Sequence, residues 1–188
     1  MKKRLLAIFI VAIISVGMLF AASATGSHST KLPESRLGIG VAVGYPSVDP
    51  ILTYTYSKPN DAFGVRAFAS AGLSFFQGLG MHASVGADWI FYKLEFTNTG
   101  SKEAENSVLD FGLGASLAFA THKGFDYIDL APAGVFSITY TFAKNWTVFT
   151  RDSFGYNIWL KNDDSPSWAS SFFWNLTLGF TYEFDLTK

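Results

Sequence analysis

The chain has 188 residues, with 14 lysines and arginines against 15 aspartates and glutamates, and it contains no cysteine. Charged residues make up only 15% of it, against roughly 25% in a typical soluble domain, whereas 17% of its residues are aromatic. The balanced charge argues against a nucleic-acid-binding surface, which needs clustered basic residues. The lack of cysteine excludes disulfides, thiolate metal sites and a cysteine nucleophile.

The first 24 residues have the pattern of an export signal. Three basic residues follow the initiator methionine, residues 5–20 carry no charge, and Ala22-Ser23-Ala24 matches the small-residue site that signal peptidase cleaves. An uncleaved anchor is the alternative, since residues 5–24 could span a bilayer as a helix. A short polar N-terminal segment, residues 25–35, favours cleavage near Ala24. We therefore expect a mildly acidic, exported mature chain.

Residues 36–188 alternate between large apolar and small or polar side chains, which is the period of a β-strand. The last segment shows this alternation most clearly, with Phe173 as the one large side chain out of pattern. Its apolar face comprises Phe172, Trp174, Leu176, Leu178, Phe180, Tyr182 and Phe184. A helix cannot sort these residues onto two faces, whereas a strand does so automatically. The alternation predicts an all-β domain.

Eight such segments are centred near residues 41, 54, 68, 86, 113, 136, 150 and 178. The turns predicted between them lie at residues 45–50, 58–61, 77–78 and 143–145, with longer polar loops at 98–106 and 161–167. No linker divides the chain after residue 36. We expect one β-barrel domain over residues 36–188, antiparallel and up-and-down, with eight strands and ten as the alternative.

Two kinds of barrel fit this pattern. A lipocalin-like binder in the periplasm turns its apolar face to an internal ligand, whereas an outer-membrane barrel turns that face to lipid. Here the polar face is rich in Gly, Ala, Ser and Thr, which suit a narrow interior better than a water-exposed surface. Aromatic residues near segment ends fit interfacial girdles, namely Tyr45, Trp89, Tyr92, Trp146, Trp159, Trp168 and Tyr182. The outer-membrane barrel is the favoured interpretation.

With its signal peptide, cysteine-free mature chain and amphipathic strands, the sequence resembles the small outer-membrane barrels of the OmpA/OmpX/OmpW-like group. The segment Phe180-Thr181-Tyr182-Glu183-Phe184 is similar to the C-terminal signal of that group, although four more residues follow Phe184. The resemblance implies residence in the outer membrane of a Gram-negative-type bacterium. It also implies contact with outer-membrane lipid, and with the barrel-assembly machinery through the C-terminal strand.

Single charges on the inward face form the main candidate site. These charges are Arg66, Asp88, Asp110, Arg151 and Glu183. Ionised groups in a narrow lumen must pair or be hydrated. A salt-bridged plug is the favoured interpretation because two basic and three acidic groups nearly balance, and a charged constriction that selects small solutes is the alternative.

His82 and Ser84 share one face of a strand, and Glu95 follows downstream. Such residues can form a hydrolase triad, and some outer-membrane barrels are acyl hydrolases with a His-x-Ser pair. The pair is predicted to face the lumen, where no acyl chain would reach it, so polar filling of the lumen is favoured over catalysis.

Other motifs predict no site. The three histidines, His28, His82 and His122, lack zinc-site spacing. The Gly-x-Gly pairs starting at Gly38, Gly78 and Gly112 lack the helix that a phosphate loop needs, and Asp163-Asp164 fits a solvated loop tip. We therefore expect a structural or narrow-channel protein with no catalysis, cofactor, metal or nucleic-acid partner. A lipocalin-like binder and an outer-membrane acyl hydrolase are the alternatives, and the sequence identifies no small-molecule ligand.

Overall fold

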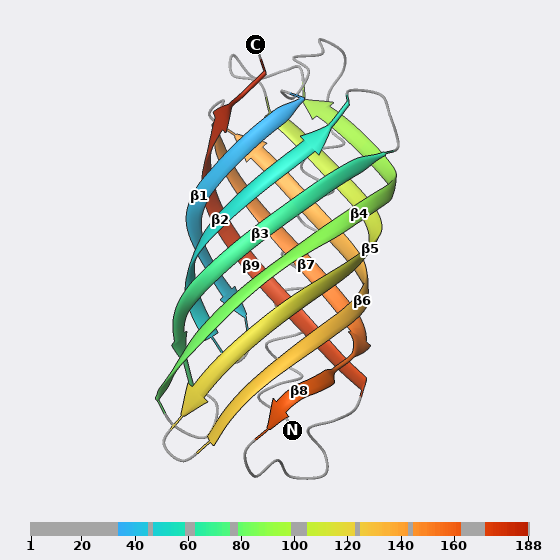
Figure 1. The fold of residues 1–188 in the computed structure, drawn as a ribbon. Helices are drawn as coiled ribbons and strands as arrows, with labels where there is room; N and C mark the ends of the chain where they lie inside the picture. Colours follow the sequence, from blue (N-terminus) through green and yellow to red (C-terminus); the bar gives the residue numbers. More distant parts are fainter. Residues whose placement is uncertain are drawn as a thin grey trace, which may run out of the picture.

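The computed structural model describes residues 34–44, 47–58, 63–75, 79–98, 105–122, 125–142, 145–162 and 172–187. The elements in these ranges are all β-strands (Figure 1). They are β1 (Ser35–Gly44), β2 (Ser47–Ser57), β3 (Gly64–Ser74), β4 (Gly80–Asn98), β5 (Glu105–His122), β6 (Phe125–Phe142), β7 (Trp146–Tyr156), β8 (Ile158–Asn162) and β9 (Phe172–Asp185). Within these ranges no helix is long and apolar enough to cross a membrane. The predicted export signal lies outside the described residues.

The strands close into a single antiparallel barrel. From β1 to β7 each strand pairs with the next one in the chain, and β9 pairs with both β7 and β1, which completes the ring. The short strand β8 pairs with β6 just beyond the end of β7, and only Asn157 separates the two. Because β7 and β8 together form one interrupted strand, the barrel has eight strands rather than ten. The strands slant strongly across the barrel wall (Figure 1), as closure requires.

The start of β1 and the end of β9 lie side by side at the same rim of the barrel (Figure 1). The residues after β9 continue its pairing with β1: the Leu186 amide donates to the Ser35 carbonyl at 2.9 Å. The Ser35 amide in turn donates to Thr187 Oγ1 at 3.1 Å. The tail beyond Phe184 therefore helps to seal the junction between the first and last strands.

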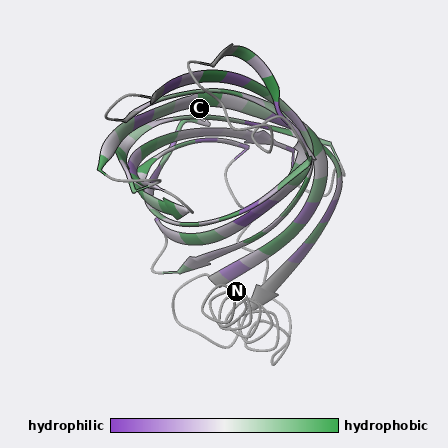
Figure 2. Ribbon diagram, turned by 90° about the horizontal axis from the view of Figure 1, so that it is seen from below, coloured by the Kyte–Doolittle hydropathy of each residue, from purple (hydrophilic) through white to green (hydrophobic). Residues whose placement is uncertain are grey.

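The two faces of the wall follow the predicted alternation. Large apolar side chains point outward and are exposed, as with Val85 at 53% and Leu113 at 56%. Small and polar side chains line the interior, and the buried ones include Ser137, Thr147 and Thr181. Viewed down the barrel, hydrophobic and hydrophilic segments alternate along the strands (Figure 2). Phe173, which breaks the pattern in the sequence, lines the lumen.

Several predicted turns and loops are shorter in the structure, because strand pairing extends into them. β2 begins at Ser47, so residues 47–50 belong to a strand and not to the predicted turn. Pro50 has no N–H to donate, and the β2–β3 register accordingly passes from Val48↔Leu73 to Ile51↔Ser70. The predicted loop at 98–106 is likewise paired strand at its two ends, since Asn98 lies opposite Glu105 and Thr97 lies opposite Asn106, and residues 99–104 lie outside the described residues. The turn predicted at residues 77–78 lies outside the described residues.

A β-bulge in β4 breaks the alternation that the sequence suggests. Ile90 pairs with Gly112 but Tyr92 pairs with Phe111, which leaves Phe91 as an extra residue. Phe91 and Tyr92 are both exposed on the outer face. As a result, odd-numbered residues face the lumen after the bulge, whereas even-numbered residues face it before the bulge.

Candidate functional site

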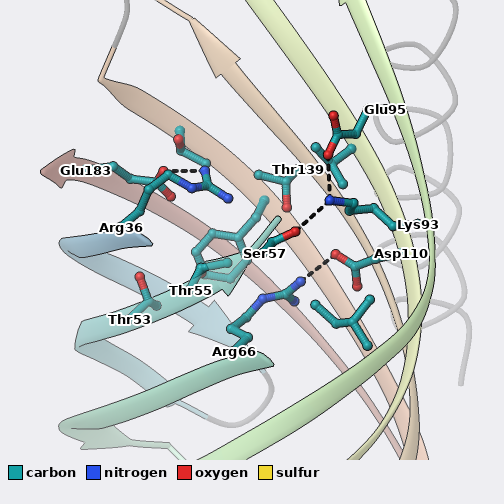
Figure 3. A pocket seen from close by; sticks show the side chains of 14 residues that line it. Arg36, Thr53, Thr55, Ser57, Arg66, Lys93, Glu95, Asp110, Thr139 and Glu183 are labelled. Carbon is teal, nitrogen blue, oxygen red and sulfur yellow. Dashed lines mark hydrogen bonds and ion pairs between the residues drawn. The ribbon is translucent and has the colours of Figure 1, made fainter. Parts of the chain in front are cut away.

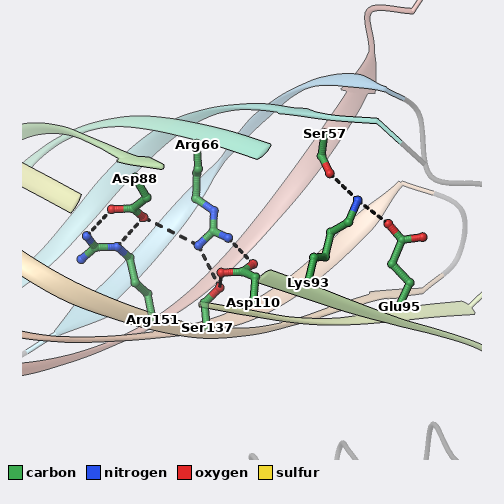
Figure 4. A network of polar contacts seen from close by, with 8 residues as sticks. All are labelled: Ser57, Arg66, Asp88, Lys93, Glu95, Asp110, Ser137 and Arg151. Atoms are coloured by element: carbon green, nitrogen blue, oxygen red, sulfur yellow. Dashed lines mark hydrogen bonds and ion pairs between the residues drawn. The ribbon is translucent and has the colours of Figure 1, made fainter. Parts of the chain in front are cut away.

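A network of four charges and one hydroxyl spans the middle of the lumen (Figure 4). Arg66 donates to Asp110 Oδ2 at 2.5 Å and to Ser137 Oγ at 2.9 Å. Ser137 in turn donates to Asp110 Oδ1 at 2.6 Å. Arg151 forms a bidentate pair with Asp88, at 2.8 Å from Nε and 2.6 Å from Nη2. Arg66 Nη1 lies 3.8 Å from Asp88 Oδ2, which links the two pairs.

Strand register explains how these residues meet. Arg66 and Asp88 lie opposite each other on β3 and β4. A second row across the sheet joins Asp110, Ser137 and Arg151 on β5, β6 and β7. Each arginine bonds the carboxylate of the other row, so the network ties the two rows together. These side chains therefore link β3, β4, β5, β6 and β7 through the lumen, in addition to the backbone pairing in the wall.

Packing around the network fixes its geometry. A Cβ at Gly114 would collide with Asp88 Oδ1 and lie 3.2 Å from Arg151 Nη2, so only glycine leaves room for the ion pair. The Arg151 guanidinium also lies 4.8 Å from the centre of the Phe68 ring, which faces the lumen. A planar, forked guanidinium suits both contacts, which an ammonium group could not make together.

The network is electrically balanced and largely buried. Two guanidinium groups face two carboxylates, and Asp88 is 1% exposed while Asp110 is 3% exposed. Burying these charges is costly unless each is paired and hydrogen-bonded, which is the case for all four. Removing any one member would leave an opposite charge unpaired in a confined space. Of the five residues predicted to act together, the structure gathers Arg66, Asp88, Asp110 and Arg151 in this network.

The fifth, Glu183, takes a different partner nearer the rim where the strands begin and end. Glu183 accepts a hydrogen bond from Arg36 Nη1 at 2.5 Å, between the adjacent strands β9 and β1 (Figure 3). Sequence reasoning did not single out Arg36, although it shares the inward phase of Gly38 and Gly40. Because Arg36 lies at the very start of the first strand, its inward orientation was not recognised from the alternation.

A third ionic group arises from the β4 bulge. Lys93 lies 2.6 Å from Glu95 Oε1 and donates to Ser57 Oγ at 2.6 Å and to the Lys58 carbonyl at 2.9 Å (Figure 4). This lysine could not be assigned to the lumen from the sequence, because simple alternation through Phe91 would turn it outward. Lys93, Arg36 and Arg66 all line a small cavity of about 40 Å³ (Figure 3).

A larger cavity of about 280 Å³ lies on the other side of the network. It is toward the end of the barrel where β1 ends and β2 begins. His82 Nδ1 lies 3.2 Å from Asp49 Oδ2, which also accepts a hydrogen bond from Ser47 at 2.7 Å. Arg66, Thr53 and Phe149 line both this cavity and the small one, so they form the partition between them.

The hydrolase triad considered from the sequence is not assembled in the structure. Ser84 is hydrogen-bonded to Ser70 at 2.9 Å, and Glu95 pairs with Lys93 beyond the network. The carboxylate that reaches His82 is Asp49, which the sequence did not indicate. In the described part of the chain, no group of three potential metal ligands comes together. His28 and the Asp163-Asp164 pair lie outside the described residues.

Most predicted interfacial aromatics that the structure describes face outward. Trp89, Tyr92 and Trp146 are exposed on the outer face. Trp159 is the exception, because it lies between the outward-facing Ile158 and Leu160, and its ring packs edge-on against Tyr127 at 5.2 Å. The expectation that Trp159 forms part of a girdle is therefore wrong. Tyr45 and Trp168 lie outside the described residues.

No protein-family model and no curated protein match the chain. Solved structures with a similar fold include the N-terminal β-barrel domain of Pseudomonas aeruginosa OprF, at 12% identity over 81% of this chain and 98% of that one, with a TM-score of 0.42. The Yersinia pestis outer membrane protein Ail in a phospholipid nanodisc has 16% identity over 81% and 100%, with a TM-score of 0.39. Escherichia coli outer membrane protein W has 16% identity over 83% and 100%, with a TM-score of 0.39. These are small barrels of the group that the sequence resembles.

Proposed function

We propose that this protein is an outer-membrane β-barrel whose lumen is closed by the Arg66–Asp88–Asp110–Arg151 network, and that its role in the membrane is structural rather than catalytic. The observation that carries the proposal is the pairing of all four buried charges with one another across the lumen. Charges that line a water-filled constriction would instead remain hydrated and individually accessible.

The outer surface supports a location in lipid. Exposed leucine, valine, phenylalanine and tryptophan side chains cover the outward face of the strands, while the paired charges face inward. A contiguous apolar surface of this kind needs a nonaqueous surrounding, because soluble proteins rarely expose large apolar patches. The same distribution argues against the lipocalin-like alternative, which requires charges on the outside of the barrel and apolar groups within.

The proposal assigns further roles to the ends of the chain. Residues 1–24 act as the export signal, and the rim that carries Ser35 and Asp185 faces the periplasm. The final strand presents Phe180, Tyr182 and Phe184 outward as its contact with the assembly machinery. The paired tail after Phe184 leaves this aromatic row on the outer face.

Cell fractionation combined with heat-modifiability on gels tests the location. A lipid-embedded barrel should sediment with the outer membrane and migrate faster before boiling than after it. Recovery of the protein in the soluble periplasmic fraction would overturn the proposal and favour a lipocalin-like binder.

A narrow channel is the second candidate function, favoured by the cavities on both sides of the network. Arg66, Thr53 and Phe149 line both cavities and lie between them. Opening of that partition would join the two cavities into a path. Conductance measurements in planar lipid bilayers distinguish this candidate from the closed barrel.

A further inference from the structure

The 280 Å³ cavity contains a buried carboxylate that no residue of the network neutralises. Asp129 lies on the inward face of β6 and lines this cavity, and the residue is only 5% exposed. Among the described residues, none donates a hydrogen bond to its Oδ1 atom. A buried acceptor without a donor is costly, so a ligand that supplies a donor or a positive charge would be strongly favoured there.

Strand register leaves open space next to Asp129. Reading across the sheet, Ser84, Ala118 and Asp129 lie in one row on β4, β5 and β6. The next row joins His82, Ala120 and Tyr127 in the same order. In each row an alanine separates the polar side chains, so the β5 wall is shallow where the groups on β4 and β6 face the lumen.

Asp49 is a second carboxylate that lines the same cavity, on the far side of His82 from Asp129. Asp49 reaches His82 by lying over Gly72, where a Cβ would be 2.6 Å from Asp49 Oδ1 and 2.7 Å from its Cα. Any other residue at position 72 would displace the carboxylate. Glycine at position 72 therefore leaves the space in which Asp49 contacts the imidazole.

The charges around the cavity do not cancel. Among the described residues that line it, the basic ones other than His82 are Arg66 and Arg151, and these are already bound to Asp110 and Asp88. Asp49 and Asp129 therefore leave an acidic excess of two carboxylates around the cavity. The imidazole beside Asp49 is that of His82. A confined acidic excess attracts a cation.

The walls favour an organic cation over a metal ion. Phe68, Tyr127 and Phe173 line the cavity together with the carboxylates, and aromatic rings stabilise ammonium groups and bury their alkyl portions. Among the described residues, no three metal-binding side chains converge. We propose that this cavity binds a small organic ammonium ion, with Asp129 meeting the positive charge and Asp49 contributing to the acidic field.

The binding of n-butylammonium chloride to the mature chain tests this proposal, measured by titration calorimetry in nanodiscs of zwitterionic lipid. We expect saturable binding of n-butylammonium and none of 1-butanol, its neutral counterpart. Asp129→Asn should weaken binding by at least about tenfold, because the ion loses a charged partner in a confined site. Asp152→Asn removes the same charge from the outer face, where Asp152 accepts a hydrogen bond from Trp174, and should bind like the unmodified chain.

A second variant guards against an indirect effect of the charge change. Ala118→Leu fills the space beside Asp129 without altering any charge and should also weaken binding. Heat-modifiable migration of every variant shows that it has folded. Equal binding by Asp129→Asn and the unmodified chain would overturn the proposal, as would the absence of saturable binding at millimolar n-butylammonium. Binding of magnesium chloride alone, with the same dependence on Asp129, would also overturn it in favour of a metal ion.

Discussion

Arg151 on β7 makes two hydrogen bonds to Asp88 on β4, although these strands are not neighbours in the barrel wall. The pair crosses the lumen and joins parts of the sheet that backbone pairing leaves separate. Because Asp88 is 1% exposed, the attraction acts in a medium that screens it little. The bond therefore acts as a brace across the barrel.

Arg151→Ala should lower the stability of the barrel, because it leaves Asp88 buried with only the more distant Arg66 for compensation. Breaking a buried pair by removing one partner costs about 3–5 kcal/mol when the pair is fully buried. Urea unfolding in detergent micelles measures the loss. In a double-mutant cycle with Asp88→Ala, the combined loss should be clearly smaller than the sum of the two single losses. Additive losses would show that the two side chains do not interact.

Gly114→Ala should destabilise the barrel through crowding alone, since the new methyl group would collide with Asp88 Oδ1. Inserting one methyl group into a tightly packed interior costs about 1–3 kcal/mol. Gly44→Ala is the control, because the nearest atom to its Cβ is Thr177 Oγ1 at 3.3 Å. Equal unfolding midpoints for the two variants would contradict the packing described around the network.

Leu178→Arg should impair insertion into lipid, because Leu178 belongs to the outward row of β9 between Leu176 and Phe180. Arginine on the lipid face near the bilayer midplane costs about 2–4 kcal/mol. Thr177→Arg places the same side chain in the lumen, where Thr177 lines the 280 Å³ cavity, and should escape that penalty. Refolding yields in phospholipid vesicles compare the two, and similar yields would show that the faces are wrongly assigned.

Deletion of Phe91 should be tolerated, because it removes the extra residue of the bulge and leaves Tyr92 outward and Lys93 inward. Deletion of Val85, in a regular stretch of the same strand, shifts every later residue to the opposite face and moves Asp88 out of the lumen. Heat-modifiability on gels shows which variant folds. A folded Val85 deletion together with a misfolded Phe91 deletion would contradict the register of β4.

The barrel itself was predictable from the sequence, because alternation alone assigns the two faces of a strand. Leu178 and Thr177, or Leu113 and Gly114, can be placed correctly without any knowledge of neighbours. The partners of each lumen charge were not predictable, since they depend on the stagger between strands. Glu183 therefore pairs with Arg36 and not with the central network.

Two further features lay beyond sequence reasoning for physical reasons. A bulge has no compositional signature in the run Ile90-Phe91-Tyr92, so the inward position of Lys93 could not be inferred. The Asp49–His82 pair depends on the close approach of β2 and β3 at Gly72, which only the folded barrel reveals. In both cases local backbone geometry decides which side chains meet.

Single-channel conductance in planar lipid bilayers tests most directly whether the central network closes the lumen. We predict that the unmodified protein conducts almost no current, and that Arg151→Ala lowers stability while conductance stays small. The contrary result is a steady open conductance in the unmodified protein, combined with a stable Arg151→Ala variant whose selectivity shifts toward cations. That outcome would show that Arg66, Asp88, Asp110 and Arg151 line a hydrated pore and do not form a plug.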